Sequence, residues 1–381
     1  MNLPASHPHL EVLATSLAVA QGTCYVFLAY DIGLAIDLAA CEQHLTLATE
    51  RATLAHKRRA PQYFAYHPAP LRIVQETEPL CLGEYRSNST VEAVLYDFGA
   101  VSLTYTFPLE GPLARLLALS DALYDNPQLL EDARRRVEQL LALIAPAVVR
   151  PAIAEMVEDY TVFHIEAFRT PCPIPALYTT HAQALAQLLR FEHRQLSAQE
   201  VRDALACRLS FGLDDLTVID WNAALLIGRD MDDVRAVLEF ANVELLELRF
   251  LDDQLDEALD QAYETLSRRS WHRLWLPGAS GADLRRIGQL QVDSAMLFEG
   301  VNNALKLLGD QYLARVYRLA SQRFHLEEWD ASILRKLQTL ESIYQKLADR
   351  AANRRMEILE WIIIVLIAVS ILLPLLPGVS W

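Results

Sequence analysis

The feature that most constrains this chain is a long apolar segment at its C-terminal end. The apolar run extends from Ile358 to Leu376, and no charged residue occurs between Trp361 and Trp381. About 21 helical residues at 1.5 Å per residue measure roughly 30 Å, which is the thickness of a bilayer core. The sequence therefore predicts a transmembrane helix over residues 356–377, with the lipid bilayer as its partner from Trp361 to Leu376.

The residues that flank this segment predict its orientation. Arg354 and Arg355 precede it, and Glu360 lies at its start, next to Trp361. Tryptophan is typical of membrane interfaces, so Trp361 and Trp381 are expected at the two surfaces. By the positive-inside rule, the bulk of the chain should stay on the cytoplasmic side, as the head of a single-pass, tail-anchored protein. The alternative is a buried C-terminal helix, which would usually be shorter and would have a polar side.

Charge and cysteine usage exclude several classes of protein. The chain has 34 Lys and Arg residues against 49 Asp and Glu residues, a net charge of −15 over 381 residues. An acidic chain binds phosphate backbones poorly, so no DNA partner is expected. The five cysteines form no CxxC pair, which indicates neither a disulfide framework nor a zinc site.

Short β-type runs and longer helical patterns alternate through the first 240 or so residues, and their order repeats. Two strands joined at Asp97 and Gly99 resemble a second pair joined at Asp220 and Asn222. Glycine and asparagine both tolerate the positive φ of tight turns. The predicted fold class is α+β: a duplicated two-layer strand-helix-hairpin-helix head with pseudo-twofold symmetry. Chance similarity of two hairpins is the alternative.

The character of the sequence changes near Val243, after which only long helical patterns occur. The predicted domains are residues 1–148 and 149–242 for the two α+β halves, 243–355 for a helical, coiled-coil-like stalk, and 356–377 for the membrane helix. In the stalk a heptad-like series predicts a homo-oligomer. Its members are Leu334, Leu337, Tyr344, Leu347 and Ala351.

The search for catalytic chemistry returns little. No phosphate loop, dinucleotide fingerprint, HExxH or GxSxG motif occurs, so no catalytic residue, no cofactor and no metal site is predicted. Asp97 and Asp220 are the best-placed carboxylates, and two acids related by pseudo-symmetry could form a catalytic pair. Aspartates at strand ends also bond simply to turn amides, and this interpretation is favoured.

Four segments carry a resemblance to a known family. They are Val94–Val101, Asn303–Tyr317, Lys336–Gln345 and Arg354–Ile364. The chain resembles the required-for-meiotic-nuclear-division family, which includes bacterial YagE-type proteins, and the Glu360-Trp361 pair is the most specific match. The resemblance implies a single-pass membrane protein, and its mitochondrial relatives are tied to translation at the inner membrane. Because this sequence has no Arg-rich amphipathic transit peptide, the expected location is the bacterial cytoplasmic (inner) membrane.

The predicted function is therefore a membrane-anchored, non-enzymatic scaffold or interaction protein with a cytoplasmic head. The resemblance adds a possible link to translation at the membrane, with another protein or the ribosome as partner. The alternative is an enzyme that acts on a nucleotide or RNA in a cleft between the two α+β halves.

Overall fold

The computed structural model describes residues 17–49, 68–267, 288–289, 292 and 311–372. The chain divides into two compact units. The first, called the head below, comprises Met1–Phe250 and Met296–Trp329, and the second, called the helical unit, comprises Leu251–Ala295 and Asp330–Trp381.

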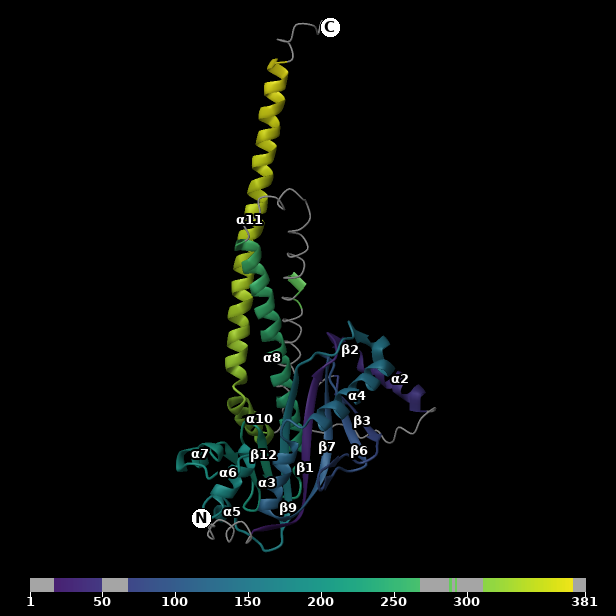
Figure 1. The fold of residues 1–381 in the computed structure, drawn as a ribbon, viewed down its shortest axis with the longest axis vertical. Coiled ribbons are helices and arrows are strands. Elements are labelled where there is room, and N and C mark those ends of the chain that lie inside the picture. The colour runs from purple at the N-terminus through teal and green to yellow at the C-terminus, as the bar shows by residue number, and fades with distance from the viewer. Residues whose placement is uncertain (1–16, 50–67, 268–287, 290–291, 293–310, 373–381) are drawn as a thin grey trace, which may run out of the picture. The chain divides into compact units, whose positions relative to one another are not determined.

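An eight-stranded mixed sheet forms the centre of the head (Figure 1). Its strands lie side by side in the order β10-β11-β12-β9-β1-β7-β6-β3. Their bounds are β1 Ala18–Asp31, β3 Leu71–Glu76, β6 Thr90–Leu95, β7 Ala100–Pro112, β9 Val157–Phe168, β10 Arg208–Leu209, β11 Leu216–Ile219 and β12 Ala223–Ile227. β9 and β12 pair in parallel, and the other neighbours are antiparallel. Two short ladders join β2 (Ala35–Ile36) to β8 (Val148–Val149) and β4 (Cys81–Leu82) to β5 (Tyr85–Arg86).

Some helices of the head begin at a side chain that caps them. The Asp37 carboxylate accepts a bond from the Ala40 amide at 3.0 Å, and Asn126 Oδ1 accepts bonds from two amides at the start of α4. Such side chains satisfy amide groups that the first helical turn leaves without partners. The helices are α2 Leu38–Thr49, α3 Leu113–Leu123, α4 Pro127–Ile144, α5 Ile174–Leu177, α6 Ala182–Arg190, α7 Ala198–Ala204 and α10 Gln311–Arg323, with a 3-10 turn at Ala145–Ala147.

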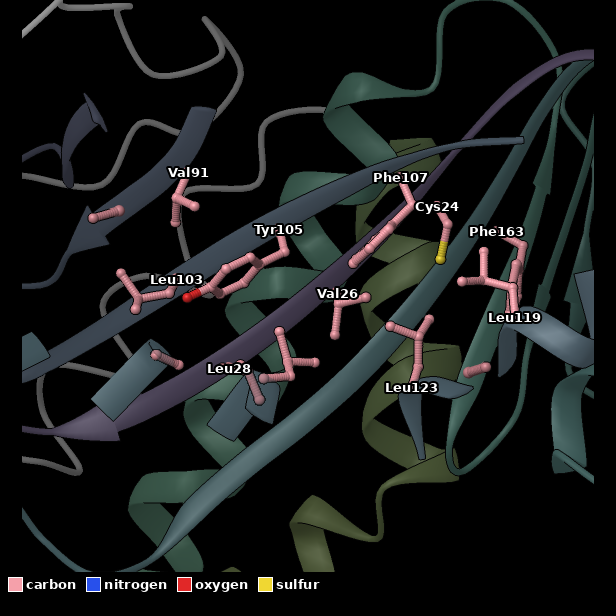
Figure 2. Close-up of a cluster of buried hydrophobic side chains, with 14 of the residues drawn as sticks. Cys24, Val26, Leu28, Val91, Leu103, Tyr105, Phe107, Leu119, Leu123 and Phe163 are labelled. Atoms are coloured by element: carbon pink, nitrogen blue, oxygen red, sulfur yellow. The ribbon is translucent and has the colours of Figure 1, made fainter. Parts of the chain in front are cut away.

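One face of the sheet is apolar and carries the main core (Figure 2). Because side chains alternate along a strand, Cys24, Val26 and Leu28 of β1 share this face. The register places Phe107, Tyr105 and Leu103 of β7 opposite them. Leu119 and Leu123 of α3 pack into the same cluster, together with buried side chains of α2, α4 and α6.

The other face of the sheet packs against α8, which runs from Asp232 to Ser267. Ala29 of β1 and Ala100 of β7 lie in a second apolar cluster with Phe240, Val243 and Leu246 of that helix. This cluster is small, and most of the remaining contacts on this face are between polar side chains. α8 continues beyond Phe250 and so contributes to both units.

The predicted duplication of the head is wrong as an exact repeat. Both halves supply four strands in matching order, β1-β7-β6-β3 and β9-β12-β11-β10. β7 is antiparallel to β1, however, whereas the equivalent β12 is parallel to β9. The two halves therefore cannot superpose strand for strand. The predicted mixture of helices and strands is confirmed, since the head is an α+β fold with a large mixed sheet.

In the helical unit, the second part of α8 and the long helix α11 (Leu326–Leu372) lie side by side. Lys336 Nζ of α11 lies 2.7 Å from carboxylate oxygens of both Asp252 and Asp256 on α8. Among the described residues of the helical unit, the buried apolar side chains are Ile333, Leu340 and Ile343 of α11 and Leu251, Leu255, Ala258 and Ala262 of α8. The buried positions of α11 do not follow the predicted heptad series, because its first member, Leu334, is 47% exposed and the preceding residue, Ile333, is buried.

The prediction of a transmembrane helix is wrong for the part of the chain that the structure describes, where no helix is both long and apolar enough to cross a membrane. The described part of α11 stops at Leu372, so its charge-free stretch is the twelve residues from Trp361. Twelve helical residues measure about 18 Å, well short of a bilayer core of roughly 30 Å. The tail anchor, the single-pass topology and the location in a bacterial cytoplasmic membrane depended on this helix and are wrong with it.

Candidate functional site

The strongest concentration of buried charge lies between α8 and the sheet, and we call it the polar layer. It comprises Asp31, Arg72, Glu92, Thr104, Glu158, Arg235, Glu239, Asn242, Glu247 and Arg249. Register explains why these side chains converge. Glu92 pairs with Thr104, so both point to the same face, and Ala29 of the α8 cluster pairs with Glu158. The layer thus occupies the face opposite the apolar core.

One half of the polar layer is a network of two arginines and two glutamates. Arg72 Nη1 lies 2.5 Å from Glu92 Oε2, and Arg72 Nη2 lies 3.7 Å from Glu239 Oε2. Thr104 Oγ1 donates to Glu239 Oε1 at 3.1 Å. Arg235 Nη1 lies 3.9 Å from Glu92 Oε2, and its guanidinium stacks over the Tyr25 ring, 4.7 Å from the centroid. The charges balance, so this half can fix α8 on the sheet but offers no unpaired base or nucleophile.

Burial and pairing act in opposite directions on Arg72. Burial tends to lower the pKa of its guanidinium, but the carboxylates of Glu239 and Glu92 outweigh that effect and raise it. Glu239 is 1% exposed, so removal of Arg72 would leave the buried carboxylate of Glu239 without its paired cation.

The other half of the polar layer is a carboxylate cluster of Asp31, Glu158 and Glu247. Arg249 Nη1 lies 2.5 Å from Glu158 Oε2, and Asn242 Nδ2 donates to the Glu158 carbonyl oxygen at 3.2 Å. Burial raises the pKa of Asp31 to about 7, although a backbone bond from Gly33 acts to lower it. Burial also raises the pKa of Glu158 to about 7, although the charge of Arg249 acts to lower it. Burial, and then the charge of Asp31, raise the pKa of Glu247 well above its usual value. Acids outnumber bases here.

Asp220, which was predicted as a turn residue, is the centre of a second ionic cluster. Its carboxylate is fully buried and bonds to Arg323, and Arg190 Nε lies 2.5 Å from its Oδ2. Both arginines also contact Asp203 of α7. Burial tends to lower the pKa of Arg323, but the bonds to Asp203 and Asp220 outweigh it and raise the pKa. This cluster ties the β11–β12 turn to α6, α7 and α10.

Asp97 and Asp220 both lie in turns between paired strands, as predicted, but the printed partners of the Asp220 carboxylate are arginines and not turn amides. The Asp97 carbonyl accepts a bond from the Ile36 amide at 2.7 Å, and the Asp220 amide donates to Ala223 at 2.9 Å. Gly99 has a φ of +110°, and a Cβ there would meet the Gly33 carbonyl oxygen at 1.7 Å, so glycine is required. Asn222 does not adopt a positive φ, contrary to the prediction.

Asp97 and Asp220 do not form a pair. They lie at the same end of the sheet, but β1 and β9 separate the strands that follow them. Three interstrand spacings of about 4.8 Å amount to roughly 14 Å, too far for two carboxylates to share a proton. The sequence signal that the prediction missed is charge inside strands and on the buried face of α8, where Arg235, Glu239 and Asn242 recur at helical spacing.

The predicted interface residues lie on or beyond α11. Glu360 is exposed, Trp361 is 67% exposed, and Arg354 and Arg355 belong to the same helix. Trp381 lies outside the described residues. In this part of α11 every residue from Trp361 to Val369 is apolar, and these residues are exposed on all sides of the helix. The large ones from Ile358 onward, all between 47% and 67% exposed, are Ile358, Leu359, Trp361, Ile362, Ile363, Ile364, Val365, Leu366, Ile367 and Val369.

The fold and these sites define a mixed-sheet α+β protein with a long helical extension and, among the described residues, no group of side chains able to hold a metal ion. Residues 21–233 match the model of a family described as "Uncharacterized protein MJ0711, N-terminal domain", and the chain belongs to this family. The match extends from β1 through β12 to the first residues of α8.

A relative and the solved structures were also compared. The chain is 22% identical to "Uncharacterized protein MJ0711" of Methanocaldococcus jannaschii over 310 residues, which cover 80% of this chain and 84% of the relative. No solved structure matches. The resemblance to the required-for-meiotic-nuclear-division family is neither supported nor contradicted by these matches and stays a prediction.

Proposed function

We propose that this protein is a non-enzymatic assembly protein in which copies of the chain join through the apolar end of α11, residues 358–369. The observation that carries the proposal is the exposure of this segment around its whole circumference. A helix that is apolar on all sides is normally buried, and contiguous exposed apolar surface marks an interaction site.

A second copy of the same chain is the occupant that the sequence of this segment fits. Apolar side chains recur along this segment at spacings of three, four and three, at Leu359, Ile362, Leu366 and Val369. Side chains at these spacings interdigitate between parallel helices. One partner helix would cover only one side of α11. Because the opposite side is equally apolar, we expect a bundle of three or more copies.

The alternative function, an enzyme acting on a nucleotide or RNA, has less support. Asp97 and Asp220 are separated by two strands, and Asp220 is held by two arginines. The link to translation depends on the family resemblance alone.

The experiment is a mass measurement of the full chain in aqueous buffer by light scattering coupled to gel filtration. The wild type should have a mass at least three times the 43.0 kDa of one chain. Ile362→Glu with Leu366→Glu places two charges on one side of the helix and should lower the mass to that of one or two chains.

A matched control and a folding check complete the test. Gln345→Glu adds a charge at an exposed position of α11 outside the apolar end and should leave the mass unchanged. Circular dichroism should show that all variants are equally helical. A monomeric wild type, or a double variant that keeps the full mass, would show that the apolar end does not join copies of this chain.

A further inference from the structure

Three buried carboxylates from three elements lie on the side of the sheet that packs against α8, and the charge of Asp31 acts on Glu247. Asp31 ends β1 and Glu158 lies near the start of β9; both are 9% exposed, and Glu247 of α8 is 1% exposed. Register places Asp31 and Glu158 on the same face, since Ala29 pairs with Glu158 and Asp31 follows two residues later. Ala29 packs with Val243 and Leu246, so Glu247 lies next to this contact.

The groups around these carboxylates supply too few donors for all of them to be ionised. Arg249 of α8 pairs with Glu158, and Arg249 itself is 39% exposed. Glu247 Oε1 and Asn242 Oδ1 are buried acceptors that have no hydrogen-bond partner among the residues that the structure describes. The other charged groups nearby are Asp159, which follows Glu158, and Glu244, which accepts a bond from Tyr317 of α10 at 2.7 Å. The turn between β6 and β7 and the start of β7 contribute Phe98 and Ala100 to the apolar contact with α8.

We propose that Asp31, Glu158 and Glu247 form a proton-binding cluster that holds residues 242–249 of α8 on the sheet and releases them as the pH rises. A buried ionised carboxylate without a counter-ion is far less stable than its protonated form. A protonated carboxyl can instead donate a hydrogen bond to one of the free acceptors. Protonation thus converts repulsion between acids into an attractive contact, which ionisation removes.

The sign of the pH dependence follows from the direction of the shifts. The pKa values of Asp31 and Glu158 are near 7 in the folded head. Carboxyl groups of an unfolded chain titrate near 4, so between these values the folded state binds more protons. Stability from this cluster is complete below about pH 4 and is lost as the pH rises through about 7.

The experiment measures amide hydrogen exchange and thermal unfolding of the full chain between pH 5 and pH 8. After correction for intrinsic exchange, amides of α8 residues 242–249 should lose at least about tenfold in protection across this range, while β1 and β7 should keep theirs. The melting temperature should fall by about 5 °C or more. Glu158→Gln is permanently neutral at a group that titrates in this range and should remove much of both changes.

Matched variants keep the proposal testable. Asp31→Asn serves if Glu158→Gln fails to fold, and Glu257→Gln neutralises an exposed carboxylate of α8 and should leave the pH dependence intact. The proposal is overturned if protection of α8 does not change with pH, or if the neutral variants keep the wild-type dependence. Restoration of the pH 8 protection by sodium, potassium or ammonium ions would also overturn it, because the cluster would then be a cation site.

Discussion

The two faces of the head's sheet are built from the same strands and differ in almost every other respect. On one face Val26, Leu28 and Leu103 pack against α2, α3, α4 and α6 in a core that is nearly free of polar atoms (Figure 2). On the other face the alternate residues of these strands meet α8 through buried arginines and carboxylates. Apolar packing stabilises the fold without requiring a specific partner for each side chain, because the hydrophobic effect is not directional. A buried ion pair stabilises the fold only when both charged partners are present.

This difference has a consequence for how the molecule can respond to its surroundings. Apolar contacts do not titrate, so the packing of apolar side chains on the core face should be indifferent to pH. The α8 face carries groups that gain or lose protons near neutrality. α8 therefore packs on the face of the sheet whose contacts can change with pH.

The largest effect is expected on the apolar face. Leu103→Ala removes a fully buried side chain and should lower the free energy of unfolding by about 3 to 5 kcal/mol, because the cavity cannot close completely. Urea unfolding followed by circular dichroism measures it. Leu213→Ala makes the same change at a position that is 92% exposed and should cost less than about 0.5 kcal/mol. Equal costs would mean that Leu103 is not part of a packed core.

A somewhat smaller effect is expected on the charged face. Glu239→Ala leaves Arg72 buried with Glu92 as its remaining close partner and should cost about 2 to 3 kcal/mol. The same urea titration measures it, with Glu341→Ala at an exposed position of α11 as the control. If Glu239→Ala costs no more than that control, the network does not hold α8.

The smallest effect is expected at the polar exception within the apolar face. Tyr105 Oη donates to Asp132 Oδ2 of α4 at 2.7 Å, and Asp132 also bonds to Arg136. Tyr105→Phe should cost about 1 to 1.5 kcal/mol, the net value of one buried hydrogen bond. Tyr124→Phe, at a tyrosine that is 63% exposed, should change nothing measurable in the same assay. A cost above that of Glu239→Ala would reverse the proposed contrast between the faces.

The Tyr105 bond also predicts a second pH effect of opposite sign. Burial tends to raise the pKa of Asp132, but the bonds from Arg136 and Tyr105 outweigh it and lower the pKa. Its contribution to stability is therefore present above the unfolded pKa near 4 and is lost on acidification. The carboxylate cluster under α8 behaves in the opposite way.

Local patterns in the sequence determined much of the secondary structure. The two hairpins, the caps at Asp37 and Asn126, the interruption between α3 and α4, and the single long helix from the start of α11 to Leu372 were all predictable, because each depends on neighbours within a few residues. The requirement for glycine at position 99 also follows from its turn.

Tertiary structure alone decided the direction of β12 beside β9, the burial of Glu239 and Glu247, and the pairing of Asp220 with Arg190 and Arg323. These features join residues that are 30 to more than 130 positions apart, as Thr104 and Glu239 show with a separation of 135. A charged residue within an apolar pattern does not reveal whether it faces water or a distant partner. The sequence therefore determined which elements form, and only the packed sheet decided which charges would be buried together.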